Sequence, residues 1–262
     1  MRANILLIAV SFTLTYVMVV IILAAGKGTR MRSEAAKVLH VLHGKPLLRY
    51  VIDLAYKINP DRIFVVVGFR KEEVKKKFVS ENVEFIEQEE QLGTGHAVMQ
   101  AKSFLGNFKG EVLVLSGDVP FLKKSTVNEM ISDHRSNNAA VTILTAEKDN
   151  PSGYGRVVRN SNNNIERIAE ETDCSKIEKT INEINSGIYC FNKKFLLESL
   201  EEIDQNNYQN EYYLTDIVKI AFDNSLPVTS VKVSNSDEVN GINTIEDLVE
   251  AEKFLEDQMG NS

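Results

Sequence analysis

The chain has 262 residues, which is enough for one large α/β domain or two small ones. Its 43% apolar and 26% charged residues are typical of a globular protein, and its formal net charge of −7 argues against a generic nucleic-acid surface. An acidic protein that handles an anionic substrate must concentrate its cations locally, which gives weight to Lys27, Arg30 and Lys37. Cys174 and Cys190 lack metal-ligand spacing and are expected to be reduced thiols.

The N-terminal part of the chain has no charged residue from Ile5 to Ala25, a run long enough to be read as a membrane span. Its second half, however, reads as a buried strand that leads into a glycine-rich loop. One segment cannot both cross a bilayer and lie in a sheet. We therefore expect residues 1–17 to be an apolar extension, or to precede the true start at Met18, with a signal peptide or anchor as the alternative.

β-rich runs and helical patterns alternate along the first half of the chain. The predicted strands are residues 19–23, 62–67, 83–86 and 111–115. The predicted helices between them are residues 46–58, 71–78 and 95–105. This alternation predicts a mostly parallel sheet with helices on both faces and right-handed crossovers.

The pattern changes after residue 138. Further strands are predicted at residues 139–144, 155–158 and 184–191, and they are expected to complete the sheet and add a lobe over its ligand edge. The Asn-rich residues 160–164 read as a hairpin tip, and residues 245–259 read as an amphipathic helix.

Residues 23–31, LAAGKGTRM, form a glycine loop directly after the first predicted strand. Glycine permits close backbone approach and positive φ, and the neighbouring cations invite an anion. The loop has Met31 in place of the third glycine of the dinucleotide-binding fingerprint, and it lacks the P-loop ending. The loop therefore predicts a phosphate-binding site that belongs to neither of these two common classes. The alternative is an ordinary strand-to-helix turn.

Polar residues also follow the other predicted strands. Asp118 comes at the end of the strand at 111–115, where a carboxylate either holds Mg²⁺ or caps the turn. Residues 88–97 open a helix and could read a base edge, with His96 as either a base or a packing residue. Amides and carboxylates in three later segments suit the hydroxyls of a sugar. Asn243 is either a neutral second metal ligand or a turn residue.

Nine motifs occur in order along the chain: LAAGKGTRM, KVLH at 37–40, QLGTGHA, GDVP, GYGR, Glu170, NSGI, NEYYLTD and Asn243. In this order and spacing, residues 18–255 resemble the uridylyltransferase domain of the bacterial bifunctional N-acetylglucosamine-1-phosphate uridylyltransferase/glucosamine-1-phosphate acetyltransferase family. QLGTGHA with NEYYLTD is specific to that family among sugar nucleotidyltransferases. The resemblance implies a Rossmann-like nucleotidyltransferase α/β fold over residues 18–259, with a mostly parallel mixed sheet, helices on both faces and a sugar-binding lobe.

The resemblance also implies site residues. Those expected to hold the uracil nucleotide are Leu23, Ala24, Ala25, Gly26, Gln88, Gly93 and Thr94. Those expected to contact the amino-sugar phosphate are Gly155, Glu170, Asn185 and Asn243. Arg30 and Lys37 match the catalytic cations that face the triphosphate, and Asp118 with Asn243 matches the Mg²⁺ ligands.

The reaction so implied joins UTP and N-acetylglucosamine 1-phosphate by direct in-line attack, giving UDP-N-acetylglucosamine and pyrophosphate with Mg²⁺ as cofactor. The alternatives are the same chemistry on another sugar 1-phosphate and a catalytically silent nucleotide-sugar sensor. We expect a cytoplasmic protein without nucleic-acid or membrane contact.

Two departures from the family matter. Relatives usually have a lysine where this chain has Thr172, which puts a charge contact near the sugar phosphate in doubt. The hexapeptide repeats of the acetyltransferase domain do not follow Met259, so acetyl transfer is not expected. Relatives trimerise largely through that domain, so the expected state is a monomer or weak dimer.

Overall fold

The computed structural model describes residues 17–106 and 108–260. The expected extension therefore lies outside the described residues, apart from Val17, where the first strand begins. No helix within the described ranges has both the length and the apolar character needed to cross a bilayer.

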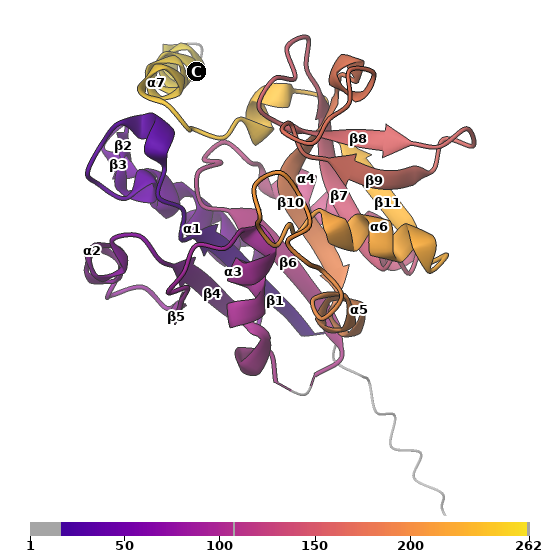
Figure 1. Cartoon of the computed structure of the whole chain (residues 1–262). Coiled ribbons are helices and arrows are strands. Elements are labelled where there is room, and N and C mark those ends of the chain that lie inside the picture. Colours follow the sequence, from indigo (N-terminus) through magenta and orange to yellow (C-terminus); the bar gives the residue numbers. More distant parts are fainter. Residues whose placement is uncertain (1–16, 107, 261–262) are drawn as a thin grey trace, which may run out of the picture.

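A nine-stranded sheet forms the centre of the molecule (Figure 1). Its strands are β1 (Val17–Ala24), β4 (Arg62–Val67), β5 (Glu84–Glu87), β6 (Gly110–Ser116), β7 (Val141–Glu147), β8 (Gly155–Arg159), β9 (Ile165–Ala169), β10 (Glu183–Asn192) and β11 (Val228–Lys232). The short strands β2 (Val41–Leu42) and β3 (Lys45–Pro46) pair separately. The helices are α1 (Leu47–Ile58), α2 (Lys71–Lys77), α3 (Thr94–Gln100), α4 (Lys124–Ser136), α5 (Lys193–Ser199), α6 (Asp216–Asp223) and α7 (Ile245–Gly260).

The sheet is mixed, with strand order β11-β7-β10-β6-β1-β4-β5. β1 runs parallel to both β4 and β6, while β10 runs antiparallel to β6 and β7. From β1 the chain moves outward through β4 and β5 and then returns to β6 on the opposite side of β1. Ligands of such sheets bind outside the carboxyl ends of the strands where the order reverses, here between β1 and β6.

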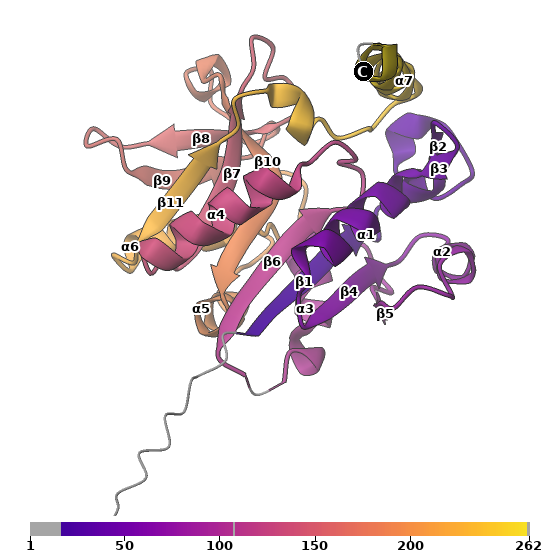
Figure 2. The same cartoon turned by 180° about the vertical axis from the view of Figure 1, so that it is seen from behind.

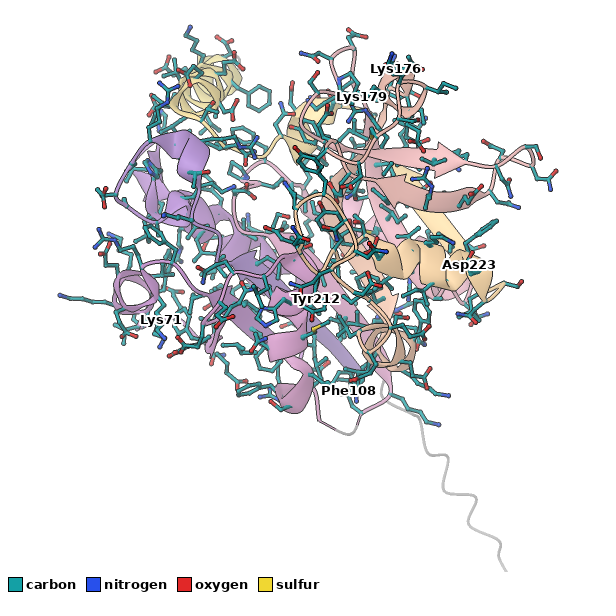
Figure 3. All side chains as sticks on the ribbon, in the orientation of Figure 1. Lys71, Phe108, Lys176, Lys179, Tyr212 and Asp223 are labelled. Atoms are coloured by element: carbon teal, nitrogen blue, oxygen red, sulfur yellow. The ribbon has the colours of Figure 1, made fainter. Side chains whose placement is uncertain are left out.

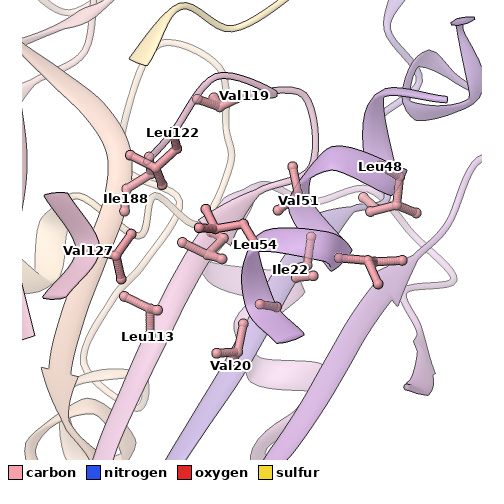
Figure 4. Close-up of a cluster of buried hydrophobic side chains, with 14 of the residues drawn as sticks. Val20, Ile22, Leu48, Val51, Leu54, Leu113, Val119, Leu122, Val127 and Ile188 are labelled. Atoms are coloured by element: carbon pink, nitrogen blue, oxygen red, sulfur yellow. The ribbon is translucent and has the colours of Figure 1, made fainter. Parts of the chain in front are cut away.

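The strand β1 shows why helices cover both faces. Val20 and Ile22 belong to one apolar cluster, together with residues of α1 and α4, and this cluster is drawn in Figure 4. Val19 and Ile21 point to the other face and pack in a second cluster with residues of α3, α5 and α6. Figure 2 shows α1 and α4 in front of the sheet, whereas α3, α5 and α6 lie in front in Figure 1. All four side chains are fully buried. A central parallel strand that is covered on both faces needs such a continuous apolar run.

The predicted strands and helices are present, with ends shifted by a few residues. The predicted helix at 95–105 is the exception, because α3 ends at Gln100 and a 3-10 turn follows at Lys102–Phe104. The hairpin tip at 160–164 joins β8 to β9, which pair antiparallel.

Seven helices and strands were not predicted from the sequence: α4, α5, α6, β2, β3, β9 and β11. In α4 the apolar face is interrupted, because polar His134 takes one of its buried positions beside Val127, Met130 and Ile131. α5 and α6 are only 7 and 8 residues long, too short for a clear helical period.

Candidate active site

The predicted site residues gather at the carboxyl ends of β1 and β6, around a cavity of about 290 Å³. Eight of them line it: Leu23, Arg30, Thr94, Asp118, Gly155, Glu170, Asn185 and Asn243. Lys37 contacts the cavity wall through Asp118. Five others do not line this cavity: Ala24, Ala25, Gly26, Gln88 and Gly93. A larger cavity of about 560 Å³ lies beside α7 and shares Tyr154 and Gly241 with the first, but none of the predicted site residues lines it.

Gly28 determines how closely Lys37 approaches the glycine loop. Its φ is 62°, in the left-handed region, and an added Cβ would lie 2.6 Å from the Cβ of Lys37. An added Cβ at Gly26 would meet nothing within 4 Å. Met31, which stands where the dinucleotide fingerprint has a third glycine, is only 1% exposed and anchors the loop in the core.

Four polar residues from distant parts of the chain converge at this point. The Nζ of Lys37 forms an ion pair with Asp118 and donates a hydrogen bond of 3.0 Å to Oδ1 of Asn243. Arg30 Nη2 donates to the same Oδ1, also at 3.0 Å. Lys27 differs, since its Nζ lies 5.8 Å from the centre of the Phe69 ring. The convergence therefore includes two of the three cations singled out in the sequence.

The donor set around Asp118 fits Mg²⁺. Asp118 and Asn243 direct oxygen atoms at one point, where the Lys37 ammonium acts as a stand-in cation. Asn243 is held in place, because its Nδ2 donates to the carbonyl of Gly241 and its backbone N–H donates to Asp247. No group of three or more His, Cys, Asp or Glu side chains gathers among the described residues. A hard cation here would take its remaining oxygen ligands from phosphate and water.

The side of the cavity where residues were expected to contact a sugar, called the sugar side below, is built by β8, β9 and β10. Glu170 Oε1 accepts a hydrogen bond of 3.0 Å from the hydroxyl of Thr215, and burial raises the pKa of Glu170. A Cβ at Gly155 would lie 3.3 Å from Glu170 Oε2, so the two residues are in close contact. Asn185 Oδ1 accepts from the backbone N–H of Gly187 at 3.1 Å.

On the opposite side, Gln88 is buried and its amide is already engaged. Its Nε2 donates to the carbonyl of Gly93 at 3.1 Å and lies 3.0 Å from Nδ1 of His96. The other ring nitrogen of His96 lies 3.0 Å from the amide of Gln100. Both nitrogens thus have partners within the protein, which favours the packing interpretation of His96 over a catalytic base.

The motifs QLGTGHA and NEYYLTD contact each other directly. Tyr212 donates its N–H to the carbonyl of Leu92 and accepts from the N–H of Gly95, both at 2.8 Å. Leu214 N–H donates to Thr94 Oγ1 at 3.1 Å. Tyr212 lies beside α3 in the middle of Figure 3. The two motifs occur together because one segment supports the other across 120 residues of sequence.

Sequence reasoning did not single out several residues that line the cavity: Ser116, Tyr154, Gly187, Tyr189 and Thr215. Each lies inside a motif quoted above or one residue beyond it. The motifs therefore located the site, but residue type alone did not indicate which members face the cavity.

The flank near Thr172 is acidic. The Thr172 hydroxyl donates to Asp173 Oδ2 at 3.1 Å, so it does not replace a lysine charge. Burial, together with the charges of Asp204 and Asp173, raises the pKa of Asp216 to about 6.

With this geometry in view, comparison with known proteins is decisive. The sequence pattern of the family described as nucleotidyl transferase matches residues 19–258. The chain belongs to the nucleotidyl transferase family. Among its relatives are proteins named "Bifunctional protein GlmU" from Geobacillus sp. strain WCH70 (43% identical), Acetivibrio thermocellus (45%) and Pelotomaculum thermopropionicum (46%). These matches cover 90–91% of this chain and 51–52% of the relatives, so the chain spans about half their length.

Solved structures of other nucleotidyl transferases share the fold. A Bacillus anthracis protein described as a glucose-1-phosphate thymidylyltransferase superimposes with a TM-score of 0.73 at 20% identity, covering 90% of this chain and 94% of the other. A UDP-glucose pyrophosphorylase complexed with UDP-glucose gives a TM-score of 0.72 at 19% identity, covering 92% and 99%. The expected Rossmann-like nucleotidyltransferase fold is thus confirmed.

Proposed function

We propose that this chain is a uridylyltransferase that converts UTP and N-acetylglucosamine 1-phosphate into UDP-N-acetylglucosamine and pyrophosphate. The observation that carries this proposal is the convergence of Arg30, Lys37, Asp118 and Asn243 beside a sugar-sized cavity. It is supported by 43–46% identity to GlmU proteins over about nine tenths of the chain.

Electrostatic repulsion is the main obstacle in this reaction, because a phosphate of about −2 charge must approach a triphosphate. Mg²⁺ bound by Asp118 and Asn243 would supply part of the neutralisation. Lys37 and Arg30 supply the rest, with Lys37 Nζ turning from Asp118 to a phosphate oxygen. Holding both phosphates in line on preorganised cations lowers the barrier without a covalent intermediate.

Neither cysteine fits the role of a nucleophile. Cys190 is fully buried, burial raises its pKa, and it does not line the cavity. The Cys174 thiol donates to the carbonyl of Ala169 at 3.4 Å, and burial raises its pKa as well. Direct attack by the sugar phosphate is therefore the simpler course.

Gly155, Glu170 and Asn185 are proposed to bind the amino sugar. The Glu170 carboxylate and the Asn185 amide both line the cavity and offer acceptors and donors to sugar hydroxyls. The proposal also implies a cytoplasmic protein, because UTP is a cytosolic metabolite.

The test is a coupled assay of pyrophosphate release with UTP, Mg²⁺ and a panel of sugar 1-phosphates. We expect the highest kcat/KM with N-acetylglucosamine 1-phosphate. Preference for a glucose or galactosamine form would replace the proposed sugar substrate. Tight UTP binding without turnover on any sugar phosphate would support a nucleotide-sugar sensor instead.

A further inference from the structure

Arg156 carries a buried charge beside the sugar side of the cavity, and no role has been assigned to it so far. The residue is only 1% exposed. Its Nη2 donates to Glu171 Oε2 at 2.8 Å, and its Nη1 donates to the carbonyl of Tyr154. Glu171 Oε2 also accepts the backbone N–H of Gly153 at 3.1 Å. One guanidinium and one carboxylate thus join the segment 153–156 to Glu171.

Stability alone is a poor explanation for this pair. Desolvation of the buried Arg156 guanidinium offsets much of its attraction to Glu171, and the Glu171 side chain is 32% exposed, so solvent weakens the pair further. The Nε of Arg156 has no hydrogen-bond partner among the described residues, which adds a further cost. The Arg156–Glu171 pair is better explained by the neighbouring residues that it holds in position.

The pair connects the two strands that present sugar-side residues. Arg156 in β8 lies opposite Ala169 in β9, and each charged residue directly follows a cavity residue in sequence. Gly155 precedes Arg156, and Glu170 precedes Glu171. The bond between Arg156 and Glu171 therefore joins the segment that begins at Gly155 to the segment that carries Glu170.

Arg156 is the main charged partner of Glu171, because the other cation near this carboxylate, Lys179, lies farther away. Lys179 Nζ lies 3.8 Å from Glu171 Oε1 and is half exposed, at the upper tip of the lobe in Figure 3. A solvated contact of that length contributes little.

We propose that the Arg156–Glu171 pair is a positioning device that sets the sugar-binding geometry of Gly155 and Glu170. This inference rests on the proposed uridylyltransferase function. Because the uridine side of the site is built separately, from β1, β5 and α3, the pair governs affinity for the sugar phosphate and not affinity for UTP.

The experiment compares Arg156→Met and Arg156→Lys with the unaltered protein. For Arg156→Met we expect the KM for N-acetylglucosamine 1-phosphate to rise by about tenfold or more and the KM for UTP to change by less than about twofold, since misplaced contacts act only on the ligand they touch. Arg156→Lys keeps the charge on a single nitrogen. Its KM for N-acetylglucosamine 1-phosphate should lie between that of the unaltered protein and that of Arg156→Met.

The matched control is Arg135→Met, which breaks the bidentate pair between Arg135 and the buried Glu111, a residue of β6 that does not line the cavity. It should lower the melting temperature and leave both KM values unchanged. If Arg156→Met alters neither KM, or raises both equally while melting earlier, the pair is merely structural and the inference is wrong. Absence of turnover in the unaltered protein with every sugar phosphate would instead refute the proposed function on which the inference rests.

Discussion

At the scale of single residues, the site depends on one small side chain as much as on its charged ones. Gly28 is the only glycine of the loop whose backbone lies in the left-handed region, and it packs against the stem of Lys37. A larger residue there would strain the loop and push Lys37 away from Asp118. Charge placement at this site is therefore set by the backbone before any ligand arrives.

Replacing Asp118 tests the proposed metal ligand. Asp118→Ala removes the only carboxylate among the proposed ligands, so Mg²⁺-dependent turnover should fall by about a thousandfold or more. The circular dichroism spectrum and the melting temperature should stay close to those of the unaltered protein. Asp149→Ala, an exposed carboxylate outside the cavity lining, serves as the control and should keep full activity. Near-native turnover of Asp118→Ala would contradict the metal assignment.

Replacing Arg30 or Lys37 tests the proposed catalytic cations. Charge moves toward the leaving pyrophosphate in the transition state. Each alanine variant should therefore mainly lower kcat, through a rise of about 2–4 kcal/mol in the activation free energy. Steady-state kinetics with varied UTP separate kcat from KM. Lys27→Ala is the matched control, because its ammonium lies over Phe69 and not at the convergence point. An effect confined to the KM for UTP would show that these cations bind only the ground state.

At the scale of elements, α4 shows how packing can build a helix that the sequence pattern hides. His134 occupies a buried position on this helix, with Nδ1 2.9 Å from the hydroxyl of Thr142 in β7. Burial lowers the pKa of His134 to about 4. Apolar periodicity misses such a helix because one of its core positions carries a titratable side chain.

This buried histidine predicts an acid-sensitive helix. Unfolded His134 binds a proton near pH 6.5 and folded His134 only near pH 4, so stability is fully present above pH 6.5 and falls as the pH drops toward 4. The loss should reach up to about 3 kcal/mol. His134→Asn keeps a polar partner for Thr142 without titrating, so chemical unfolding at pH 7 and pH 4.5 should show a smaller pH difference for the variant. Equal pH differences would mean that folding does not lower the pKa of His134.

At the scale of the whole molecule, the order of strands brings the site together. The strand order reverses between β1 and β6, which run parallel, and the 210–216 segment returns from the far half to support the 91–97 segment. β1 pairs with β4 from Val19 to Ala24 and with β6 from Val17 to Leu23. Its side chains pack in apolar clusters on both faces of the sheet, so we expect the apolar run to be divided near the start of this strand.

A protein beginning at Met18 tests this division. We expect it to fold and to retain full turnover, because the hydrogen bonds between Met18 and Asp61 and the pairing of β1 from Met18 onward are kept. Melting temperature, turnover and membrane fractionation of the two lengths are the measurements. Loss of folding or activity in the shorter protein would show that residues 1–17 contribute to the domain.

Several features of this protein could be predicted from its sequence alone. Alternating apolar runs and helical patterns predicted the parallel half of the sheet, because burial on two faces imposes an apolar run on each central strand. The glycine loop and the order of motifs predicted the family, because close backbone approach to phosphate restricts residue choice locally. These are properties of short segments, and patterns within a short segment can be recognised without knowing the tertiary structure.

Only the tertiary structure decided which of these segments meet. Lys37 and Asp118 are 81 residues apart, and Lys37 and Asn243 are 206 apart, so their contact depends on strand order and register. The same holds for the Arg156–Glu171 pair, which neither motif nor spacing indicates, and for the separation of Lys27 from the other cations. A contact between distant residues is fixed by the packing of the elements that carry them, and that packing minimises the free energy of the whole chain rather than of any one segment.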